Sequence, residues 1–450
     1  MISTNKKSII FMPYIILIIL FFINLLTTWP GSMTPDSFTQ YYIAQSQIYS
    51  DHHPALMSFV WHYLDIIYQG PGLMLAFHLL LLYGAAAYGV SIFINCWMAY
   101  LFVALPLLPI VIIYSFKIWK DVGFAFSFLI ASMMLSHAIA KQRPLYLIEQ
   151  LSFWLILFYG TCVKFQAQYC APIIIVFYVI HHSQFFANNL SKILIAFGVI
   201  IGTFYGGFFY VNNILVPPEQ KNNSWQYVKM YDLAAISFDS GTMYMPKFLY
   251  TKHFTTEKFL ATFNHQSVDN IVLVKDSIFR SALNSQELNN LWWQWAKTVI
   301  SHPLPYMKHR SINMGYSLLS LPEFNCVKDF LDNSFDINSI QYKTLYYTAR
   351  LISYFLVGHI LIAIVSMAYL YLGIITLKAT WAAFPLIMLN SVNFMIISTL
   401  FFCSMAGTPR YTYIVACLTS ASHAFAWVCF QHHLSLGRIC GNKMTSRIEL

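Results

Sequence analysis

Long apolar runs separated by short polar segments make up most of this chain. A membrane-spanning helix needs about 20 apolar residues, and runs of about that length recur along the sequence. The sequence therefore predicts an all-α polytopic membrane protein with about ten transmembrane helices. In chain order we expect them at Ile9–Trp29, Leu73–Asn95, Trp97–Phe116, Val122–Ala140, Leu145–Val163, Ala171–Phe186, Ile193–Asn213, Tyr346–Leu372, Trp381–Phe402 and Tyr411–Phe430.

One long polar stretch, residues 214–345, interrupts this pattern between the seventh and eighth predicted spans. It mixes short apolar patches with polar residues, and its length suits a small folded domain of mixed structure. Neither an internal repeat nor a low-complexity tract is visible in the chain. We expect three parts: an N-terminal transmembrane module over 1–213 with its first outer loop at 30–72, an extracytoplasmic domain over 214–345, and a C-terminal transmembrane module with a cytoplasmic tail over 346–450.

Basic residues in the short loops predict the orientation of these spans. Lys6 and Lys7 precede the first span, and Lys141, Lys192 and Lys378 then fall on the same side of the membrane. Because short cytoplasmic loops are enriched in Lys and Arg, both termini are expected in the cytoplasm and the long polar stretch outside it. The first apolar run lacks a small-residue cleavage site and is followed by further spans, so we interpret it as a retained anchor.

Composition excludes several classes of protein. With 58% hydrophobic and 10% charged residues and a mean hydropathy of +0.58, the chain does not resemble a soluble domain. The net charge of +9 is scattered over loops without a nucleic-acid motif. The eight cysteines show no CxxC spacing, which argues against a zinc site. Cys162 and Cys170 flank a short loop and could form a disulfide, although free membrane cysteines are the favoured interpretation.

Four basic residues break the orientation rule. Lys117, Lys120, Lys164 and Arg410 lie in three short loops on the outer side, where basic residues are disfavoured. One interpretation is that their long side chains reach the lipid headgroups. The other is a shared anion site, which we favour because acidic residues of the first outer loop lie on the same side. Such a site would suit the phosphate of a lipid carrier.

Asp36, just after the first span, has two interpretations. The sequence Pro35-Asp36-Ser37 is typical of a helix start, with Asp36 or Ser37 as the N-cap. Alternatively, Asp36 is a general base. Moving a sugar from a phosphate to a hydroxyl needs a group that takes the hydroxyl proton. The departing phosphate needs positive charge instead of a proton.

The rest of the first outer loop predicts two interfacial helices. Aromatic residues recur at helical spacing over residues 38–49, and an amphipathic stretch follows Pro54. The turn between them would hold Asp51 and His53 close to Asp36. Carboxylate and imidazole suit zinc or manganese, so a divalent metal ion is one interpretation of this turn. A purely structural turn before Pro54 is the other.

Two dipeptides at the heads of predicted spans carry further candidate chemistry. Lys120-Asp121 could form an ion pair at a helix start, or Lys120 could bind phosphate while Asp121 orients it. Arg410-Tyr411 could be an interfacial anchor, or Arg410 could bind phosphate through two nitrogens. The sequence leaves both pairs of interpretations open.

The order of these features resembles the GT-C superfamily of integral-membrane glycosyltransferases, especially bacterial relatives of dolichyl- or polyprenyl-phosphate-sugar-dependent protein O-mannosyltransferases. The matching residues are the outer-loop Asp36, the D-x-HP element of Asp51, His53 and Pro54, the K-D of Lys120 and Asp121, the basic Lys164, and the RY of Arg410 and Tyr411.

This resemblance implies an inverting transfer from a polyprenyl-phosphate sugar at the outer face of a bacterial inner membrane. Asp36 would be the base, in a catalytic group with Asp51 and His53. Around the carrier phosphate would lie Lys120, Asp121, Lys164, Arg410 and Tyr411. Many relatives carry a second acidic residue where this chain has Ser37, which leaves the use of a metal open.

Two other functions share parts of this pattern. A transporter or flippase of lipid-linked saccharides would show inverted repeats and charges near mid-membrane, whereas here the charges gather at one interface. A glycan ligase or polymerase would share the topology and the outer basic residues. The expected partners are a polyprenyl-phosphate-linked sugar donor, membrane lipids and an acceptor whose class the sequence does not reveal, with no nucleic acid.

Overall fold

The computed structural model describes residues 3–186, 190–321 and 358–445, together with positions 340, 343, 347 and 351. This part of the chain is all helical, with single β-bridges and no strand. Seven helices in it are long and apolar enough to cross a membrane, which indicates a membrane-embedded protein. The candidate spans are Phe11–Thr28, Gly72–Ile92, Lys120–Ala140, Leu190–Ile214, His359–Thr376, Ala383–Cys403 and Pro409–Ser435.

Most predicted spans coincide with single helices. The long ones are α1 (Ser3–Thr28), α4 (Gly72–Ile92), α7 (Lys120–Ala140), α10 (Leu190–Phe209), α17 (His359–Thr376), α18 (Ala383–Cys403) and α19 (Tyr413–Thr445). Helices α8 (Leu147–Cys162) and α9 (Ala167–Phe186) fall on two further predicted spans, and α8 is a shorter apolar helix. The first residues of the predicted span at Tyr346–Leu372 lie largely outside the described residues.

The predicted span at Trp97–Phe116 is not one helix. The chain forms α5 (Ala99–Ala104), the short 3-10 turn η1 (Leu105–Leu107) and α6 (Pro109–Ser115) instead. Pro106 and Pro109 explain the break, because proline lacks the backbone N–H that a helix interior needs. The prediction of a continuous helix here is wrong.

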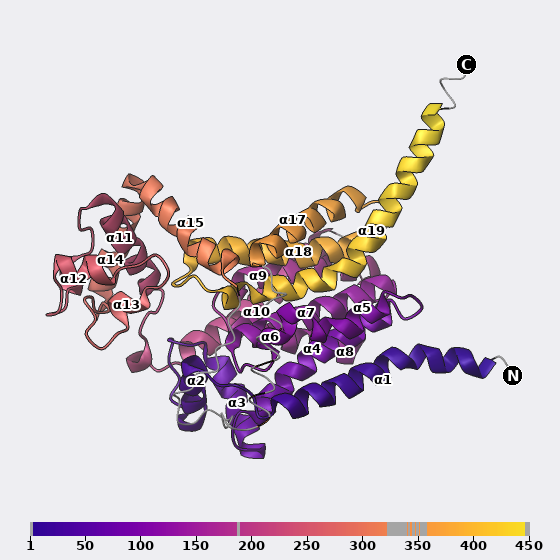
Figure 1. The fold of residues 1–450 in the computed structure, drawn as a ribbon, viewed down its shortest axis with the longest axis horizontal. Coiled ribbons are helices and arrows are strands. Elements are labelled where there is room, and N and C mark those ends of the chain that lie inside the picture. Colours follow the sequence, from indigo (N-terminus) through magenta and orange to yellow (C-terminus); the bar gives the residue numbers. More distant parts are fainter. Residues whose placement is uncertain are drawn as a thin grey trace.

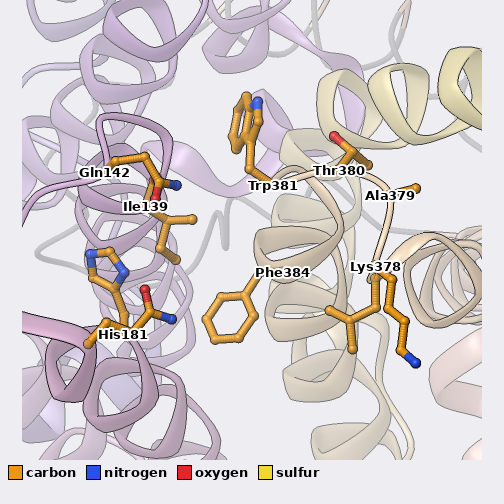
Figure 2. Close-up of a pocket in the computed structure, with 10 residues that line it drawn as sticks. Ile139, Gln142, His181, Lys378, Ala379, Thr380, Trp381 and Phe384 are labelled. Carbon is orange, nitrogen blue, oxygen red and sulfur yellow. The ribbon is translucent and has the colours of Figure 1, made fainter. Parts of the chain in front are cut away.

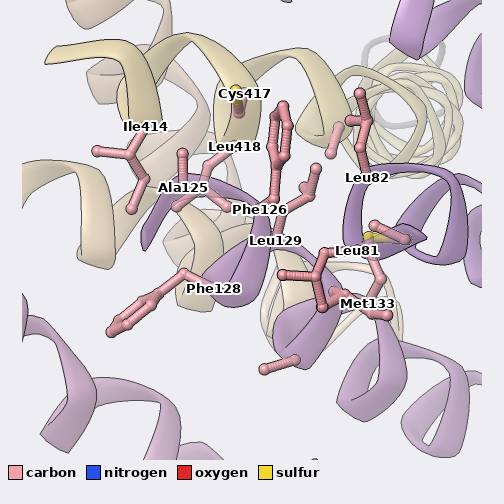
Figure 3. Close-up of a cluster of buried hydrophobic side chains, with 14 of the residues drawn as sticks. Leu81, Leu82, Ala125, Phe126, Phe128, Leu129, Met133, Ile414, Cys417 and Leu418 are labelled. Atoms are coloured by element: carbon pink, nitrogen blue, oxygen red, sulfur yellow. The ribbon is translucent and has the colours of Figure 1, made fainter. Parts of the chain in front are cut away.

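Helix α7 lies at the centre of the bundle. Of its 21 residues 18 are buried, and it packs against α4, α8, α18 and α19. Figure 3 shows apolar side chains of α4, α7 and α19 meeting around Phe126 and Leu129. A side chain on Gly160 of α8 would begin 2.7 Å from the Ser127 Cβ, so this glycine permits the close approach of α8. This packing fixes the first residues of α7, which carry the Lys120-Asp121 pair.

Neutral polar side chains join the last three membrane helices. Asn390 of α18 accepts from Ser366 of α17 at 2.7 Å and donates to Ser422 of α19 at 3.2 Å. Asn393, also on α18, donates to Ser366 and to Thr419 of α19, both at 3.0 Å. Hydrogen bonds of this kind hold helices together in an apolar environment. They fix α19, and with it the loop that precedes it.

The two ends of the bundle differ in what they carry. Figure 1 shows both chain termini at one end, while α2 (Pro35–Ser46), α3 (Ala55–Ile67) and α11 to α14 lie at the other. The two helices predicted in the first loop are therefore confirmed. The N-cap of α2 is Thr34, so the prediction of Asp36 or Ser37 as the cap is wrong. Asp36 lies within the first turn.

Residues 214–321 form a helical unit with its own core. The helices are α11 (Gln226–Ser240), α12 (Thr256–Thr262), α13 (Asp269–Val272), α14 (Ser285–Ser301) and α15 (Pro303–Leu319). Met230, Phe259 and Phe279 are among the side chains buried between them. The described part of the segment has isolated bridges and no strand, so the expectation of a mixed domain is wrong there. Helix α15 leads back to the bundle and packs against α17, α18 and the turn η5 (Pro409–Thr412).

The end that carries the termini holds a pocket of about 360 Å³. Figure 2 shows Gln142 after α7, His181 of α9 and Lys378 after α17 around this pocket. They lie in or next to the loops and helix ends that carry Lys141, Lys192 and Lys378, which the sequence analysis predicted to share one side of the membrane. The structure thus brings the α7–α8 and α17–α18 loops together at one end of the bundle.

Candidate functional site

The first outer loop binds directly to the loop before α7. Ser32 forms a parallel bridge with Lys117, and the Ser37 hydroxyl donates to the Ile118 carbonyl at 2.7 Å. The Trp119 indole N–H donates to the Thr34 hydroxyl at 2.8 Å. Because Thr34 and Ser37 belong to the first turn of α2, these bonds fix the position of that turn. Asp36 is in the same turn.

Asp36 forms an ion pair with Arg410 across two distant parts of the chain. The Arg410 Nη1 and Asp36 Oδ2 atoms are 2.9 Å apart, and the side chains are 24% and 31% exposed. Burial alone would raise the pKa of the Asp36 carboxyl, but the charges of Arg410 and Lys120 outweigh it and hold that pKa well below its usual range. Asp36 is therefore an ionised carboxylate that solvent can still reach.

Lys120 contacts His53 at the edge of the same site. The Lys120 Nζ donates to the His53 Nδ1 at 2.7 Å. Burial, and then the Lys120 charge, hold the pKa of His53 well below its usual range, so its neutral ring accepts this bond. His53 thus positions Lys120 without neutralising it.

Lys164 and Asp121 form a third contact, a buried ion pair between the loop after α8 and the first turn of α7. The Lys164 Nζ also lies 4.3 Å from the centre of the Tyr411 ring. The Arg410 guanidinium carbon lies 5.2 Å from that ring and 5.4 Å from the Trp119 ring. Two cations thus flank one tyrosine at the head of α19.

Asp51 binds the polar segment. Its two carboxylate oxygens accept the backbone N–H groups of Asn222 and Asn223 at 2.6 and 2.7 Å. Its carbonyl accepts the Ser224 hydroxyl at 3.1 Å. These bonds make Asp51 a structural link between the first outer loop and the start of α11. Its predicted catalytic role stays a prediction.

A cavity of about 500 Å³ adjoins this charged cluster. On the bundle side it is lined by Lys120, Lys164 and Tyr411, and on the opposite side by residues of the polar segment. Asp36 and Arg410 are not among its lining residues, although they neighbour three that are. The cavity therefore lies where the membrane helices and residues 214–321 meet.

The last turn of α10 and the short helical turn η2 (Tyr210–Ile214) after it form one side of the cavity. Phe208 and Asn212 line it, near the end of the span Leu190–Ile214. Few residues of that span are buried inside the protein, so much of its surface faces outward, although Ile193, Phe197 and Tyr205 pack partly against the core. The cavity consequently lies beside a helix surface that is free to contact lipid.

The residues that could hold a metal already have protein partners. Asp36 pairs with Arg410, the Asp51 carboxylate accepts two backbone N–H groups, and the His53 Nδ1 accepts from Lys120. Across the residues that the structure describes, no group of three or more His, Cys, Asp or Glu side chains gathers to hold an ion. The interpretation of this turn as a site for a divalent metal ion stays a prediction. Cys162 and Cys170 are both free and buried.

The loop that carries Arg410 is held by a glycine. A side chain on Gly407 would collide with the backbone carbonyl of Asn313 in α15. The Gly407 N–H donates to the Gln266 carbonyl at 2.7 Å. Because a backbone atom cannot rotate away, only glycine fits this contact. The polar segment thereby sets the position of the Arg410 loop.

The sequence suggested eight residues for the catalytic group and the carrier phosphate, and the structure gathers seven of them: Asp36, His53, Lys120, Asp121, Lys164, Arg410 and Tyr411. Asp51 lies nearby and binds the polar segment instead. Lys117, the further basic residue of the expected anion site, is buried with its Nζ 4.4 Å from the centre of the Trp119 ring. Sequence reasoning missed Trp119, which contacts both Thr34 and Arg410. It also missed Lys229 and Trp225 of the cavity wall, whose place depends on how the polar segment docks.

Comparisons with known proteins leave the family open. No protein-family model matches the chain, and neither the curated proteins nor the solved structures contain a significant match. The resemblance to the GT-C superfamily therefore rests on the short motifs alone. What the chain does must be argued from the site itself.

Proposed function

We propose that this protein is a membrane glycosyltransferase that moves a sugar from a polyprenyl-phosphate carrier to an acceptor on the outer face of the membrane. One observation carries the proposal. Candidate residues from the first outer loop, the head of α7, the loop after α8 and the head of α19 converge on one cluster beside a cavity of about 500 Å³.

The charges in this cluster favour an anionic ligand. Lys164 is paired with Asp121, and Arg410 with Asp36, whereas Lys120 forms its hydrogen bond with a neutral imidazole and, among the described residues, no ion pair of its own. Positive charge is therefore in excess, and an arginine beside lysines suits a phosphate. In the proposed reaction these groups bind the carrier phosphate and stabilise it as it leaves.

The Asp36–Arg410 pair suggests how donor binding prepares the base. A carboxylate whose pKa is held low by arginine is a weak base, because general bases work best when their pKa lies near the working pH. When the carrier phosphate takes Arg410 as its partner, Asp36 loses that partner and its pKa rises. Asp36 is then a stronger base, and only in the presence of donor.

The transfer step balances with these residues. Asp36 takes the proton of the acceptor hydroxyl, and the acceptor oxygen forms a bond to the anomeric carbon of the sugar. The bond between that carbon and the phosphate oxygen breaks, and the carrier phosphate keeps the electron pair. Attack from the face opposite the phosphate inverts the anomeric centre. No step uses a metal ion.

The surface of α10 offers a path for the polyprenyl chain. Because much of the surface of this helix faces outward and the helix ends at the cavity, the isoprenoid could lie against it while the phosphate enters. We infer about ten crossing segments, counting α8, α9 and the broken stretch α5–α6 with the seven long helices. With both termini in the cytoplasm, the cavity opens on the outer face.

Radiolabelled polyprenyl-phosphate sugars in membranes holding the wild type or Asp36→Asn provide the test. We expect label to reach an acceptor only with the wild type, with equal amounts of folded protein in both membranes. If the wild type moves no label to an acceptor, yet labelled lipid changes leaflet at the same rate in both membranes, the protein is a transporter and the proposal fails.

A further inference from the structure

The polar segment contributes its own basic residues to one wall of the cavity. They are distinct from the basic residues around Asp36, namely Lys120, Lys164 and Arg410. Lys221, Asn223, Ser224, Trp225 and Lys229 all line the cavity from this side. They come from the loop before α11 and from its first turn. This wall has no counterpart among the candidate residues that the sequence suggested.

Lys229 is held in place between two indole rings. Its Nζ lies 3.8 Å from the centre of the Trp225 ring and 5.3 Å from that of Trp295. A cation over the face of tryptophan is attracted to it without losing its charge. The side chain is thus ordered at the cavity wall and keeps its hydrogen-bond donors.

No acidic side chain neutralises this lysine. In the described part of the chain, neither Lys229 nor Lys221 takes part in an ion pair. Asp232, one turn along α11, instead pairs with Arg310 at 2.7 Å and accepts from Trp295 at 2.8 Å. The Asp51 carboxylate also lines the cavity, but its two oxygens accept the backbone N–H groups of Asn222 and Asn223. Among the described residues, the two lysines of this wall are thus left without a carboxylate in direct contact.

Burial makes this charge costly in the absence of a ligand. It lowers the pKa of Lys229 to about 8, against the opposing influence of Asp232 and of Cys403 in α18. An anion beside Lys229 would favour its charged form again. The Asn223 side-chain amide at the same wall provides N–H donors suited to an anion's remaining oxygens.

We propose that Lys229, with Lys221 and Trp225, forms a second anion subsite in the cavity, separate from the one around Arg410 and Lys120. It would bind a second phosphate-like group of the reacting molecules. That group belongs either to the acceptor or to a second phosphate of the carrier. The proposal rests on the proposed function for its biological meaning, while the binding itself can be tested alone.

Equilibrium dialysis of the full-length protein in detergent against radiolabelled inorganic phosphate tests the subsite. We expect two bound phosphates per chain for the wild type and one for Lys229→Gln, with an affinity at the second site reduced by about tenfold or more. Lys229→Arg should restore the second site. The control is Lys297→Gln, which removes an exposed lysine of α14 that does not line the cavity and should leave both sites.

Inorganic pyrophosphate distinguishes the two sources of the second anion. One pyrophosphate per chain, weakened equally by Lys229→Gln and Arg410→Gln, means that one diphosphate bridges both subsites. Two per chain, each lost in one variant, mean that the second anion belongs to another molecule. Both outcomes support the subsite.

Two results would overturn it: a Lys229→Gln protein that keeps both phosphates, or a wild type that binds no more phosphate than that variant. Thermal unfolding of each variant would show that a lost site is not a lost fold. If the protein binds two phosphates but transfers no sugar, the proposed function is contradicted while the second anion subsite is still supported.

Discussion

Two aspartate–arginine pairs in this protein have nearly the same geometry and opposite surroundings. Asp36 and Arg410 lie 2.9 Å apart with about a third and a quarter of their side chains exposed, at the edge of a cavity. Asp232 and Arg310 lie 2.7 Å apart and are fully buried between α11 and α15. The first pair can exchange its partner for a ligand. The second cannot, because nothing from solvent reaches it.

We therefore expect the Asp36–Arg410 pair to act in function and the Asp232–Arg310 pair to stabilise the fold. The Arg310 Nη1 also donates to the Ser404 carbonyl at 2.7 Å, so the buried pair connects the polar segment to the chain before Arg410. The Trp295 indole N–H donates a hydrogen bond to the other carboxylate oxygen of Asp232. Among the described residues, the carboxylate of the partly exposed pair has no such second hydrogen bond, and it neighbours Lys120 and His53 instead. The variants below test whether the two pairs behave as their surroundings predict.

The largest effect is expected from Asp36→Asn. Removing a general base costs about 10²- to 10⁴-fold in the rate of the chemical step. The fold should be unaffected, because Asp36 is partly exposed and Thr34 caps its helix. The measurements are sugar transfer and thermal unfolding of the same preparation. A variant with near-wild-type transfer would remove Asp36 from the mechanism.

Arg310→Met should act on stability instead. It leaves the Asp232 carboxylate buried without its partner, which costs about 3–5 kcal/mol of stability for a broken buried pair. We expect a lower unfolding temperature and faster proteolysis of residues 214–321. The double variant Asp232→Leu/Arg310→Met removes both charges and should recover much of the loss. An Arg310→Met protein as stable as the wild type would contradict the architectural role.

Gly407→Ala tests the contact between α15, which carries Arg310, and the loop that carries Arg410. The new methyl group would collide with the Asn313 carbonyl and displace the loop that carries Arg410. A misplacement of about 1 Å can cost about 10²-fold in rate. Gly241→Ala provides a control, because its surroundings are open, although its positive φ adds a small strain. Equal transfer by Gly407→Ala and the wild type would show that the loop position is not critical.

The smallest effect is expected from Arg410→Lys. Lysine keeps the charge but loses the two-point contact with phosphate, so we expect the KM for the donor to rise by about tenfold. Arg410→Ala should raise it further. The measurement is donor saturation at fixed acceptor. If arginine, lysine and alanine give the same KM, Arg410 is an interfacial anchor.

Much of the site could be predicted because charge at a membrane surface is costly. Asp36, Lys120, Lys164 and Arg410 stood out for their type and their common side, and sidedness follows from local sequence. That Asp36 pairs with Arg410, and Lys164 with Asp121, depends on the helix packing and could not be predicted. The break in the helix at Pro106 and Pro109 could have been predicted from the sequence, because both prolines lie inside the apolar run.

The polar segment was the least predictable region. Asp51 was interpreted as catalytic, yet its carboxylate binds the backbone of Asn222 and Asn223. The second wall of the cavity, with Lys229, exists only because Asp51 and α15 hold this segment against the bundle. Contacts between residues so far apart in the chain cannot be predicted from the local sequence pattern around either residue. The mixed structure expected for residues 214–321 likewise proved to be helices and turns in the described part, where the apolar stretch 231–238 lies within α11.

The exchange of Arg410 from Asp36 to the donor phosphate is the central claim, and the pH dependence of transfer tests it most directly. The profile of kcat/KM for the donor reports the free enzyme, in which Arg410 holds the pKa of Asp36 well below its usual range. The profile of kcat reports the donor complex, in which Asp36 has lost that partner. Because a raised pKa means protonation at higher pH, kcat should begin to fall at a higher pH than kcat/KM as the solution is acidified. Acid limbs that coincide at the same low pH would mean that the pair stays intact with donor bound, and would contradict the account.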